Sequence, residues 1–418
     1  MRIISTRKGY IIMFEKKITI NKMRVIIFVL LFAFFEPSCI SDLAYINGGF
    51  FLIIHYIIAI LRYSGICCIV LLFWFKNINK ISLYTWLLLA LQIFYLVICY
   101  MHNKSGVGSS NLVTSLIIFI LSGCMDIFHS KDTNYVCDIL KSVFKWLIIF
   151  NFISIIIFPN GMYYDAVRDF PENYFLGFKN QHIYYFLAYF VFDFKDNVMT
   201  INKKFDFKEV IIDVMMLLSS LISGATTSFF ILMMIIIMKK LIVKISAINP
   251  VFMLFISFGV SIFLVLSSFQ KSIVNSLDMY FGKDGSLFHR TSIWKMSVLC
   301  IAKSPVWGNG NIDVPLKWSW DVGQCHNKYI DLLFVGGIIY FIVYLIFVLI
   351  ACHDARILSK KFNMNIFSFA LYGLFILYIV EANRTEFISF TIFALIHYLK
   401  RTMNNKTNDK FLRKARYE

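Results

Sequence analysis

The segment from Tyr329 to Ile350 reads YIDLLFVGGIIYFIVYLIFVLI and contains one charged side chain, that of Asp331. A helix needs about 20 predominantly apolar residues to cross the hydrocarbon core of a bilayer, so this segment predicts a membrane-spanning helix. Apolar stretches of similar length recur from Val25 to Leu399, and 59% of the chain is hydrophobic while 16% is charged. This balance excludes a soluble domain, which needs a polar surface.

The pattern of these stretches predicts an all-α, polytopic integral membrane protein. Alternating segments of the kind that build membrane β-barrels are missing from the sequence, and a helix satisfies its own backbone hydrogen bonds in lipid. We expect about 12 transmembrane helices. The predicted spans are residues 25–40, 57–75, 82–101, 111–128, 139–158, 181–194, 209–222, 226–238, 249–268, 328–352, 363–381 and 387–399.

Basic residues predict the orientation of the spans, because Lys and Arg accumulate in cytoplasmic loops. With both termini in the cytoplasm, the inner segments hold most of the 41 Lys and Arg residues, whereas the 24 acidic residues divide evenly. The net charge of +17 therefore lies on the inner side. Anionic lipid of the inner leaflet explains this charge, and no single segment is a dense basic groove for nucleic acid.

The predicted organisation places the longest connection outside the cell. Its parts are a basic cytoplasmic arm (1–24), nine transmembrane helices with an outer loop at 159–180 (25–268), a large extracytoplasmic loop between spans 9 and 10 (269–327), three further helices (328–399) and a basic cytoplasmic tail (400–418). No cleavage site of a signal peptide follows the basic start. A connection as long as the large loop indicates function.

The run from Val210 to Met238 is too long for one spanning helix, since it would extend roughly 44 Å at 1.5 Å per residue. Small hydroxyl residues between Ser223 and Ser228 favour two short helices joined by a tight outer hairpin, because such side chains satisfy backbone groups at a break. The alternative is that these small residues serve close packing between helices.

Arg290 and Trp294 lie in the large loop, before an apolar stretch that ends in a turn at Pro305–Gly310. The planar guanidinium fork of Arg suits a diphosphate. The alternative for Arg290 is a side chain that only reaches from the membrane interface into water.

The chain re-enters the membrane at His326–Asp331, where helical spacing makes His326 a neighbour of Tyr329 and Asn327 a neighbour of Asp331. A His here could take a proton from an attacking hydroxyl, because an unperturbed His has a pKa of about 6.5. The alternative is a helix start at which His326 and Asn327 satisfy backbone donors.

A second polar group, which includes Arg168, Lys179 and Asn180, precedes the sixth span. Two cationic sites from separate loops could hold one diphosphate. For Arg168 the alternative is a local salt-bridge cluster with its acidic neighbours in sequence.

We expect no metal and no cofactor. The eight histidines include no pair at metal-ligand spacing, the nine cysteines include no CxxC, and no Gly-rich phosphate loop is present. Cys300 and Cys325 share the large loop, so a disulfide between them is an open alternative in an oxidising compartment.

Four segments together resemble the O-antigen polymerase and O-antigen ligase superfamily of bacterial membrane glycosyltransferases. They are GFKNQH (Gly177–His182), LLSSLISGATTS (Leu217–Ser228), HRTSIWKMSVLCIAKSPVWGNG (His289–Gly310) and HNKYIDLLFVGG (His326–Gly337). Their order, and the long outer loop between the last two, agree with the family pattern. The resemblance covers about residues 160–345.

The resemblance implies a GT-C-like enzyme in the bacterial plasma (inner) membrane that acts on sugar chains carried by undecaprenyl diphosphate. It implies inverting, metal-independent transfer, in which a sugar hydroxyl attacks the anomeric carbon and the lipid diphosphate leaves. Arg290 would hold the diphosphate, and His326 would lie near the acceptor hydroxyl. The predicted substrate-binding residues are Arg168, Lys179, Asn180, Trp294, Asn327 and Tyr329.

The sequence departs from the family where Gly224 and Ala225 occupy the hairpin that often has an Arg beside its Ser. This departure favours a polymerase of O-antigen or a related surface polysaccharide over an O-antigen ligase. A flippase of lipid-linked oligosaccharides is an alternative of another class, but we find no internal repeat and few charges within the spans. Expected partners are the lipid-linked oligosaccharide, membrane lipid, a chain-length regulator and a flippase.

Overall fold

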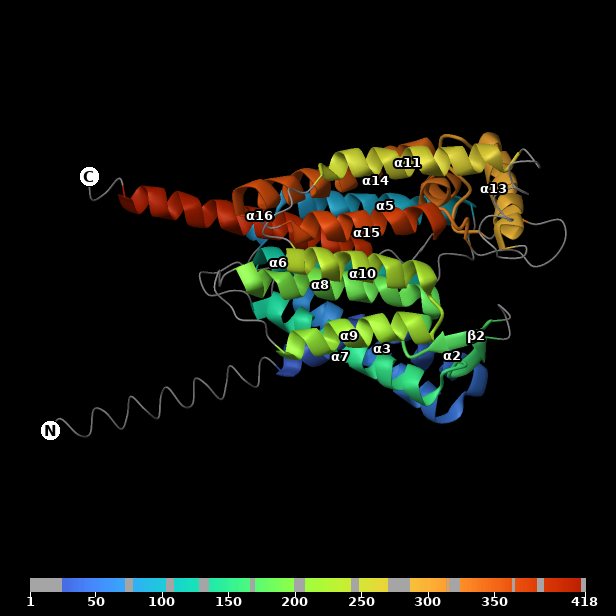
Figure 1. Cartoon of the computed structure of the whole chain (residues 1–418), viewed down its shortest axis with the longest axis horizontal. Helices are drawn as coiled ribbons and strands as arrows, with labels where there is room; N and C mark the ends of the chain where they lie inside the picture. The colour runs from blue at the N-terminus through green and yellow to red at the C-terminus, as the bar shows by residue number, and fades with distance from the viewer. Residues whose placement is uncertain are drawn as a thin grey trace. The chain divides into compact units, whose positions relative to one another are not determined.

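The computed structural model of the chain is mostly helical (Figure 1). It describes residues 25–71, 78–102, 109–127, 135–165, 170–198, 207–241, 248–269, 286–312, 314–315, 324–362, 365–381 and 387–414. Within these ranges, 5 helices are long and apolar enough to cross a membrane. They are α3 (Gly49–Ile69), α5 (Leu83–His102), α7 (Tyr135–Ile157), α11 (Pro250–Ser267) and α14 (Lys328–Phe362). This confirms a helical membrane protein and leaves the count of about 12 spans a prediction.

The other helices are shorter, less apolar or bent. They are α2 (Ser38–Asn47), α6 (Ser109–Ile127), α8 (His182–Val198), α9 (Phe207–Ile222), α10 (Thr226–Leu241), α13 (Ser286–Lys303), α15 (Ile366–Val380), α16 (Phe387–Lys414) and the short 3-10 turns η2 (Ile78–Lys80) and η3 (Lys179–Gln181). The helix Val25–Phe34 is bent by 61° against α2, and the pair would make a sixth span. The bend separates the first predicted span into two helices at Pro37, because a proline restricts the residue before it and has no N–H to donate.

The helices fall into two compact units, and the first contains α2, α3, α7 and α9. It also contains a three-stranded antiparallel sheet, in the order β1 (Tyr163–Asp165), β2 (Phe170–Tyr174) and β3 (Gly177–Phe178). The sheet occupies the predicted outer loop 159–180. Tyr163 ties it to α2 by donating its hydroxyl to Asp42 Oδ2 at 2.6 Å and by packing on Cys39.

The second unit contains α5, α6, α10, α11, α13, α14, α15 and α16. Its core lies around α15, which is apolar on every face, as expected of a helix buried on all sides. Phe367, Ala370 and Leu371 of this helix are fully buried. The hydroxyl groups of Tyr344 on α14 and Tyr378 on α15 lie 2.8 Å apart and so satisfy each other.

α14 is broken at Gly337, whose φ of 65° and ψ of −168° are not helical. The predicted turn at Pro305–Gly310 fits into this break. Asn309 N donates to Phe334 O at 2.7 Å, and Ile338 N donates to Pro305 O at 2.9 Å. The turn thus satisfies backbone groups that the break would leave without partners, and it fixes the end of α13 on α14.

The run from Val210 to Met238 forms two helices, as the polar residues in its middle predicted. α9 ends at Ile222 and α10 begins at Thr226. Gly224 in the turn between them has a φ of +69°, which an L side chain rarely adopts. The structure therefore has a break between two helices here and not one continuous helix.

Candidate functional site

The structure places both residues that the sequence predicted to be catalytic against a third, Glu381. Arg290 Nη2 on α13 donates to Glu381 Oε1 at 3.4 Å, and His326 Nδ1 lies 3.5 Å from Glu381 Oε2. Glu381 directly follows α15. All three side chains are partly exposed, with exposed fractions of 29%, 25% and 13% for Arg290, His326 and Glu381. The site is therefore a pair of cationic or basic groups that share one carboxylate.

His326 has a strained backbone. Its φ of 48° makes it the one non-glycine residue with a positive φ in the described ranges. Such a conformation costs of order 1–3 kcal/mol and persists where the surroundings determine it. Those surroundings are the buried residues on either side of His326, namely Cys325 and Asn327.

Cys325 is held from two directions. Its carbonyl accepts a hydrogen bond from Trp294 Nε1 at 3.0 Å, and its N–H donates to Asp331 Oδ1 at 3.2 Å. Its thiol lies 3.3 Å from Ser297 Oγ. Neither Cys325 nor Cys300 is joined in a disulfide, and the same holds for the other seven cysteines. The disulfide that the sequence left open is thus absent from the structure.

Asn327 caps α14 and also holds the loop against α15. Its Oδ1 accepts from Tyr329 N at 3.1 Å and Ile330 N at 3.2 Å, and its Nδ2 donates to Ile379 O at 3.0 Å. The helix-start alternative thus describes Asn327 well. Because Ile379 is two residues before Glu381, this bond also positions His326 beside the carboxylate.

Trp294 and Tyr329, predicted to bind substrate, are buried and bonded to protein atoms. Trp294 contacts Cys325 as described, and the Tyr329 hydroxyl is hydrogen-bonded to Ser257 Oγ on α11. Lys328, between His326 and Tyr329, is 2% exposed, with its Nζ 3.8 Å from Asp331 Oδ2 and 5.9 Å from the centroid of the Tyr344 ring. Buried polar side chains that bind other protein atoms therefore support the site.

Lys179 and Asn180 lie in η3, in the first unit. The Lys179 ammonium forms an ion pair with Glu172. It also approaches the hairpin, because a Cβ added to Gly224 would lie 3.9 Å from Lys179 Nζ. The cation of Lys179 is thus close to the hairpin position at which the family often has an Arg. Arg168 lies outside the described residues.

His182, which follows η3, is fully enclosed. Its Nε2 lies 3.1 Å from Gly177 O and its Nδ1 lies 3.3 Å from Asn151 Nδ2. A Cβ at Gly177 would lie 2.7 Å from Gln181 Oε1, so the glycine is required for this close approach. The GFKNQH segment therefore holds η3 in place, and Lys179 is its partly exposed cation.

Sequence reasoning missed Glu381. It ends the apolar stretch 363–381, and Arg290, which it contacts, is 91 positions away. A carboxylate that adjoins an otherwise apolar span is costly unless it has a partner. This signal could have marked Glu381, although it could not have shown which cation it faces.

The helices and this site define an integral membrane protein with a charged centre at the ends of α13, α14 and α15. Residues 211–345 match the family model described as O-antigen ligase, which is consistent with the O-antigen polymerase and ligase superfamily that the four segments resemble. The match covers less than half of the chain, includes Arg290 and His326, and ends before Glu381. It supports a glycosyltransferase-like function, polymerase or ligase, in general. No curated protein matches the chain.

Proposed function

We propose that this protein is a polymerase that joins undecaprenyl-diphosphate-linked oligosaccharide repeats into O-antigen or a related surface polysaccharide. The observation that carries the proposal is the shared carboxylate. Arg290 and His326 come from two segments within the matched region and both face Glu381. A base beside a fixed cation is the minimum that transfer from a lipid diphosphate requires.

In the proposed reaction, His326 takes the proton of the acceptor hydroxyl as that oxygen attacks the anomeric carbon of the donor chain. The bond from that carbon to the diphosphate oxygen breaks, and the leaving diphosphate keeps the electron pair. Arg290 stabilises the charge that develops there. General-base catalysis contributes about 10²- to 10⁴-fold, and removal of one fixed electrostatic donor costs about 3 to 4 kcal/mol.

Glu381 has two roles in this proposal. Its Oε2 lies 3.5 Å from His326 Nδ1, which makes no hydrogen bond among the described residues. A closer approach in the substrate complex would let the carboxylate accept from Nδ1–H and leave Nε2 as the base. Glu381 also holds the Arg290 guanidinium on α13. Approach of a diphosphate would give Arg290 a second anionic partner, since a guanidinium has five N–H donors.

Lys179 is the second cation in this proposal, and Asn180 and Arg168 are the further substrate-binding residues. Trp294, Asn327 and Tyr329, which are buried, hold the site in place. The ion pair with Glu172 holds the Lys179 ammonium beside Gly224. This position supports the idea that Lys179 takes the place of the missing hairpin Arg. The missing hairpin Arg is also the reason that we prefer a polymerase to a ligase, because the hairpin departs from the ligase pattern.

The predicted topology belongs to the proposal. About 12 spans, both termini in the cytoplasm and a large extracytoplasmic loop at 269–327 would place Arg290, His326 and Glu381 at the outer face of the plasma membrane. There the lipid-linked substrate is available. A tag inserted at residue 286 that is accessible only from the cytoplasm would overturn this arrangement. A chain-length regulator and a flippase stay predicted partners.

The second candidate is an O-antigen ligase, because the matching family model supports polymerase and ligase alike. A gene deletion distinguishes the candidates on a lipopolysaccharide gel. Core that carries one repeat indicates a polymerase, and bare core with accumulated lipid-linked polymer indicates a ligase. Bare core with single repeats that stay on the cytoplasmic side indicates a flippase and contradicts both.

The site is tested by Arg290→Ala and His326→Ala, each expressed in the deletion strain. Both variants should reach the membrane and yield no polymer. Lys303→Ala is the matched control, since Lys303 is an exposed cation in the last turn of the same α13. Full-length polymer from both site variants would remove Arg290 and His326 from the mechanism.

A further inference from the structure

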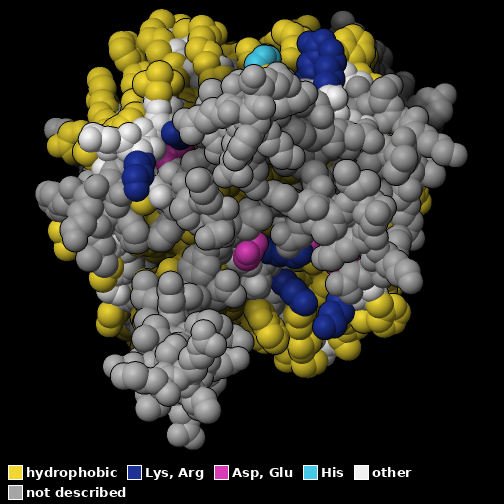
Figure 2. Space-filling view, turned by 90° about the vertical axis from the view of Figure 1, so that its left-hand side faces the viewer, with side chains coloured by type: hydrophobic (Ala, Val, Ile, Leu, Met, Phe, Trp, Pro, Cys, Tyr) yellow, Lys and Arg dark blue, Asp and Glu magenta, His cyan; other side chains and the backbone are white. Residues whose placement is uncertain are grey.

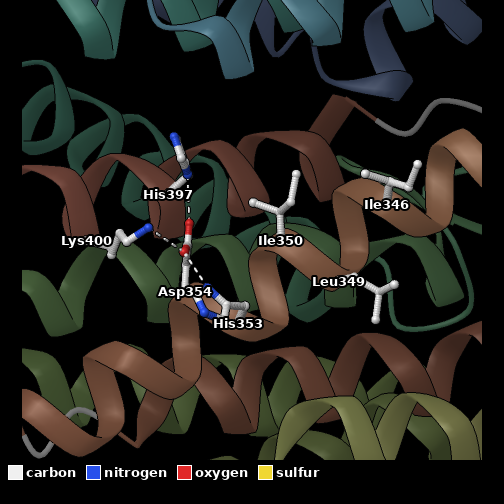
Figure 3. A pocket seen from close by; sticks show the side chains of 7 residues that line it. All are labelled: Ile346, Leu349, Ile350, His353, Asp354, His397 and Lys400. Atoms are coloured by element: carbon white, nitrogen blue, oxygen red, sulfur yellow. Dashed lines mark hydrogen bonds and ion pairs between the residues drawn. The ribbon is translucent and has the colours of Figure 1, made fainter.

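A pocket of about 420 Å³ lies between α14 and α16, at the opposite end of α14 from His326 (Figure 3). Its apolar wall is formed by Ile346, Leu349 and Ile350, which lie on one face of α14 because they are three and four residues apart. Ile346 and Leu349 are exposed. Since α14 is apolar enough to cross a membrane, we expect this wall to face acyl chains.

The polar end of the pocket is built around Asp354, which is 1% exposed. Its carboxylate lies 3.0 Å from Lys400 Nζ, 2.7 Å from His397 Nδ1 and 3.3 Å from His353 Nδ1. One buried carboxylate thus gathers three groups that carry or can accept a positive charge. An ammonium has three N–H donors, and the bond to Asp354 uses one, so Lys400 keeps donors for a second anion.

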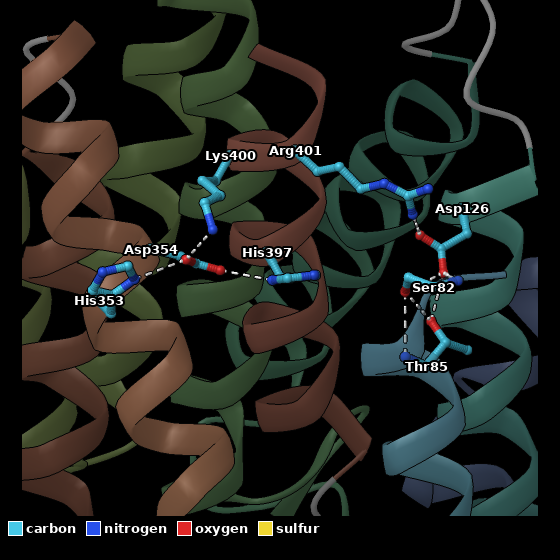
Figure 4. A network of polar contacts seen from close by, with 8 residues as sticks. All are labelled: Ser82, Thr85, Asp126, His353, Asp354, His397, Lys400 and Arg401. Atoms are coloured by element: carbon cyan, nitrogen blue, oxygen red, sulfur yellow. Dashed lines mark hydrogen bonds and ion pairs between the residues drawn. The ribbon is translucent and has the colours of Figure 1, made fainter. Parts of the chain in front are cut away.

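A neighbouring charged cluster is centred on Asp126 and uses the next cation of α16, Arg401. Arg401 extends away from Asp354 (Figure 4), and its Nη1 donates to Asp126 Oδ1 at 2.8 Å. Asp126 Oδ2 also accepts from Ser82 Oγ at 2.6 Å and from Thr85 Oγ1 at 2.7 Å. This set of bonds ties α16 to α6 and to the start of α5. Of the two adjacent cations, Lys400 is therefore the one that lines the pocket.

An aliphatic wall that ends in Lys and His matches an amphiphile with an anionic head group. Basic pockets between transmembrane helices at the cytoplasmic side bind the head groups of anionic lipids. The predicted topology places this end of α14 at that side, and Lys and Arg side chains are visible on the face toward which α16 runs (Figure 2). A cluster that only tied α14 to α16 would explain the buried Asp354 but not the exposed His353 and the aliphatic wall beside it.

We propose that this pocket binds one anionic phospholipid. Its phosphate lies against Lys400 and His353, and an acyl chain follows Ile346, Leu349 and Ile350. The site is remote from Arg290 and His326 along α14, so it does not depend on the proposed polymerase reaction. It shares with the proposed function only the predicted orientation of α14.

Native mass spectrometry of the purified full-length protein, loaded with phosphatidylglycerol or with phosphatidylcholine, tests the proposal. The wild type should retain one phosphatidylglycerol and much less phosphatidylcholine. His353→Gln and Lys400→Gln should each lower the bound fraction of phosphatidylglycerol about fivefold. Leu349→Trp should lower it too, because the indole fills the apolar wall. His353 and Leu349 are exposed, so these two variants keep the fold.

Arg356→Gln is the matched control, because Arg356 is an exposed cation on the next turn of α14 that does not line the pocket. It should bind phosphatidylglycerol as the wild type does. Equal retention of both lipids by the wild type, or an equal loss in the Arg356 control, would overturn the proposal. Complete displacement of phosphatidylglycerol by millimolar inorganic phosphate would also overturn it, since the ligand would then be free phosphate.

Discussion

Replacing Gly337 by Ala should destabilise the protein strongly, because two backbones meet at this residue. A Cβ at position 337 would lie 2.2 Å from Val306 O and 2.6 Å from Gly308 N, which is closer than real Cβ contacts. The φ and ψ of Gly337 also fall in a region that is essentially restricted to glycine, at a cost of about 1–3 kcal/mol for another residue. Displacement of the turn at Pro305–Gly310 adds about 1–3 kcal/mol. The total is about 2–6 kcal/mol.

Thermal unfolding in detergent, followed by intrinsic tryptophan fluorescence, measures this effect. Trp294 is 2% exposed and lies in the packing that the turn supports, so its emission should change on unfolding. A loss of about 2–6 kcal/mol lowers the midpoint of a 418-residue chain by roughly 2–7 °C. Gly259→Ala is the control, since Gly259 lies in α11 with no atom within 4 Å of an added Cβ, and Ala there should be neutral or slightly stabilising. Equal midpoints for the two variants would falsify the close approach of the turn to the break in α14.

Three further substitutions test the site. Glu381→Gln keeps the size of the side chain and removes its charge. It should lower the rate of polymer formation by about 10²-fold, the lower end of the contribution of a general base. A wild-type ladder on a lipopolysaccharide gel would count against a role for the shared carboxylate. Asn327→Ala should lower the unfolding free energy by about 1–2 kcal/mol through loss of the cap. Asn327→Asp should restore only part of it in the same melting assay, because it keeps the cap but loses the bond to Ile379 O. Lys179→Met should shorten or abolish polymer with an unchanged melting midpoint, and full-length polymer would show that Lys179 is not the second cation.

Much of the helix pattern could be predicted from hydropathy. The predicted span 249–268 corresponds to α11, and the predicted break in the run from Val210 to Met238 lies between α9 and α10. These features depend on local composition, which one sequence contains.

Contacts between distant segments could not be predicted. The sequence shows glycines at positions 308 and 337 but does not show that each leaves room for the other's backbone. It shows Arg290 and His326 in one loop region but does not show that the end of α15 supplies their common partner. Both results depend on how α13, α14 and α15 pack, and packing is a property of the folded chain.

The nine cysteines offer a direct route to the side of the membrane on which each loop lies. Six of them are buried, while Cys67 and Cys68 are exposed and Cys300 is intermediate. Serine at those three positions would give a background of low reactivity toward maleimides. A single new thiol in any connecting segment could then be labelled in intact cells with a membrane-impermeant reagent, which would report the sidedness of that segment one position at a time.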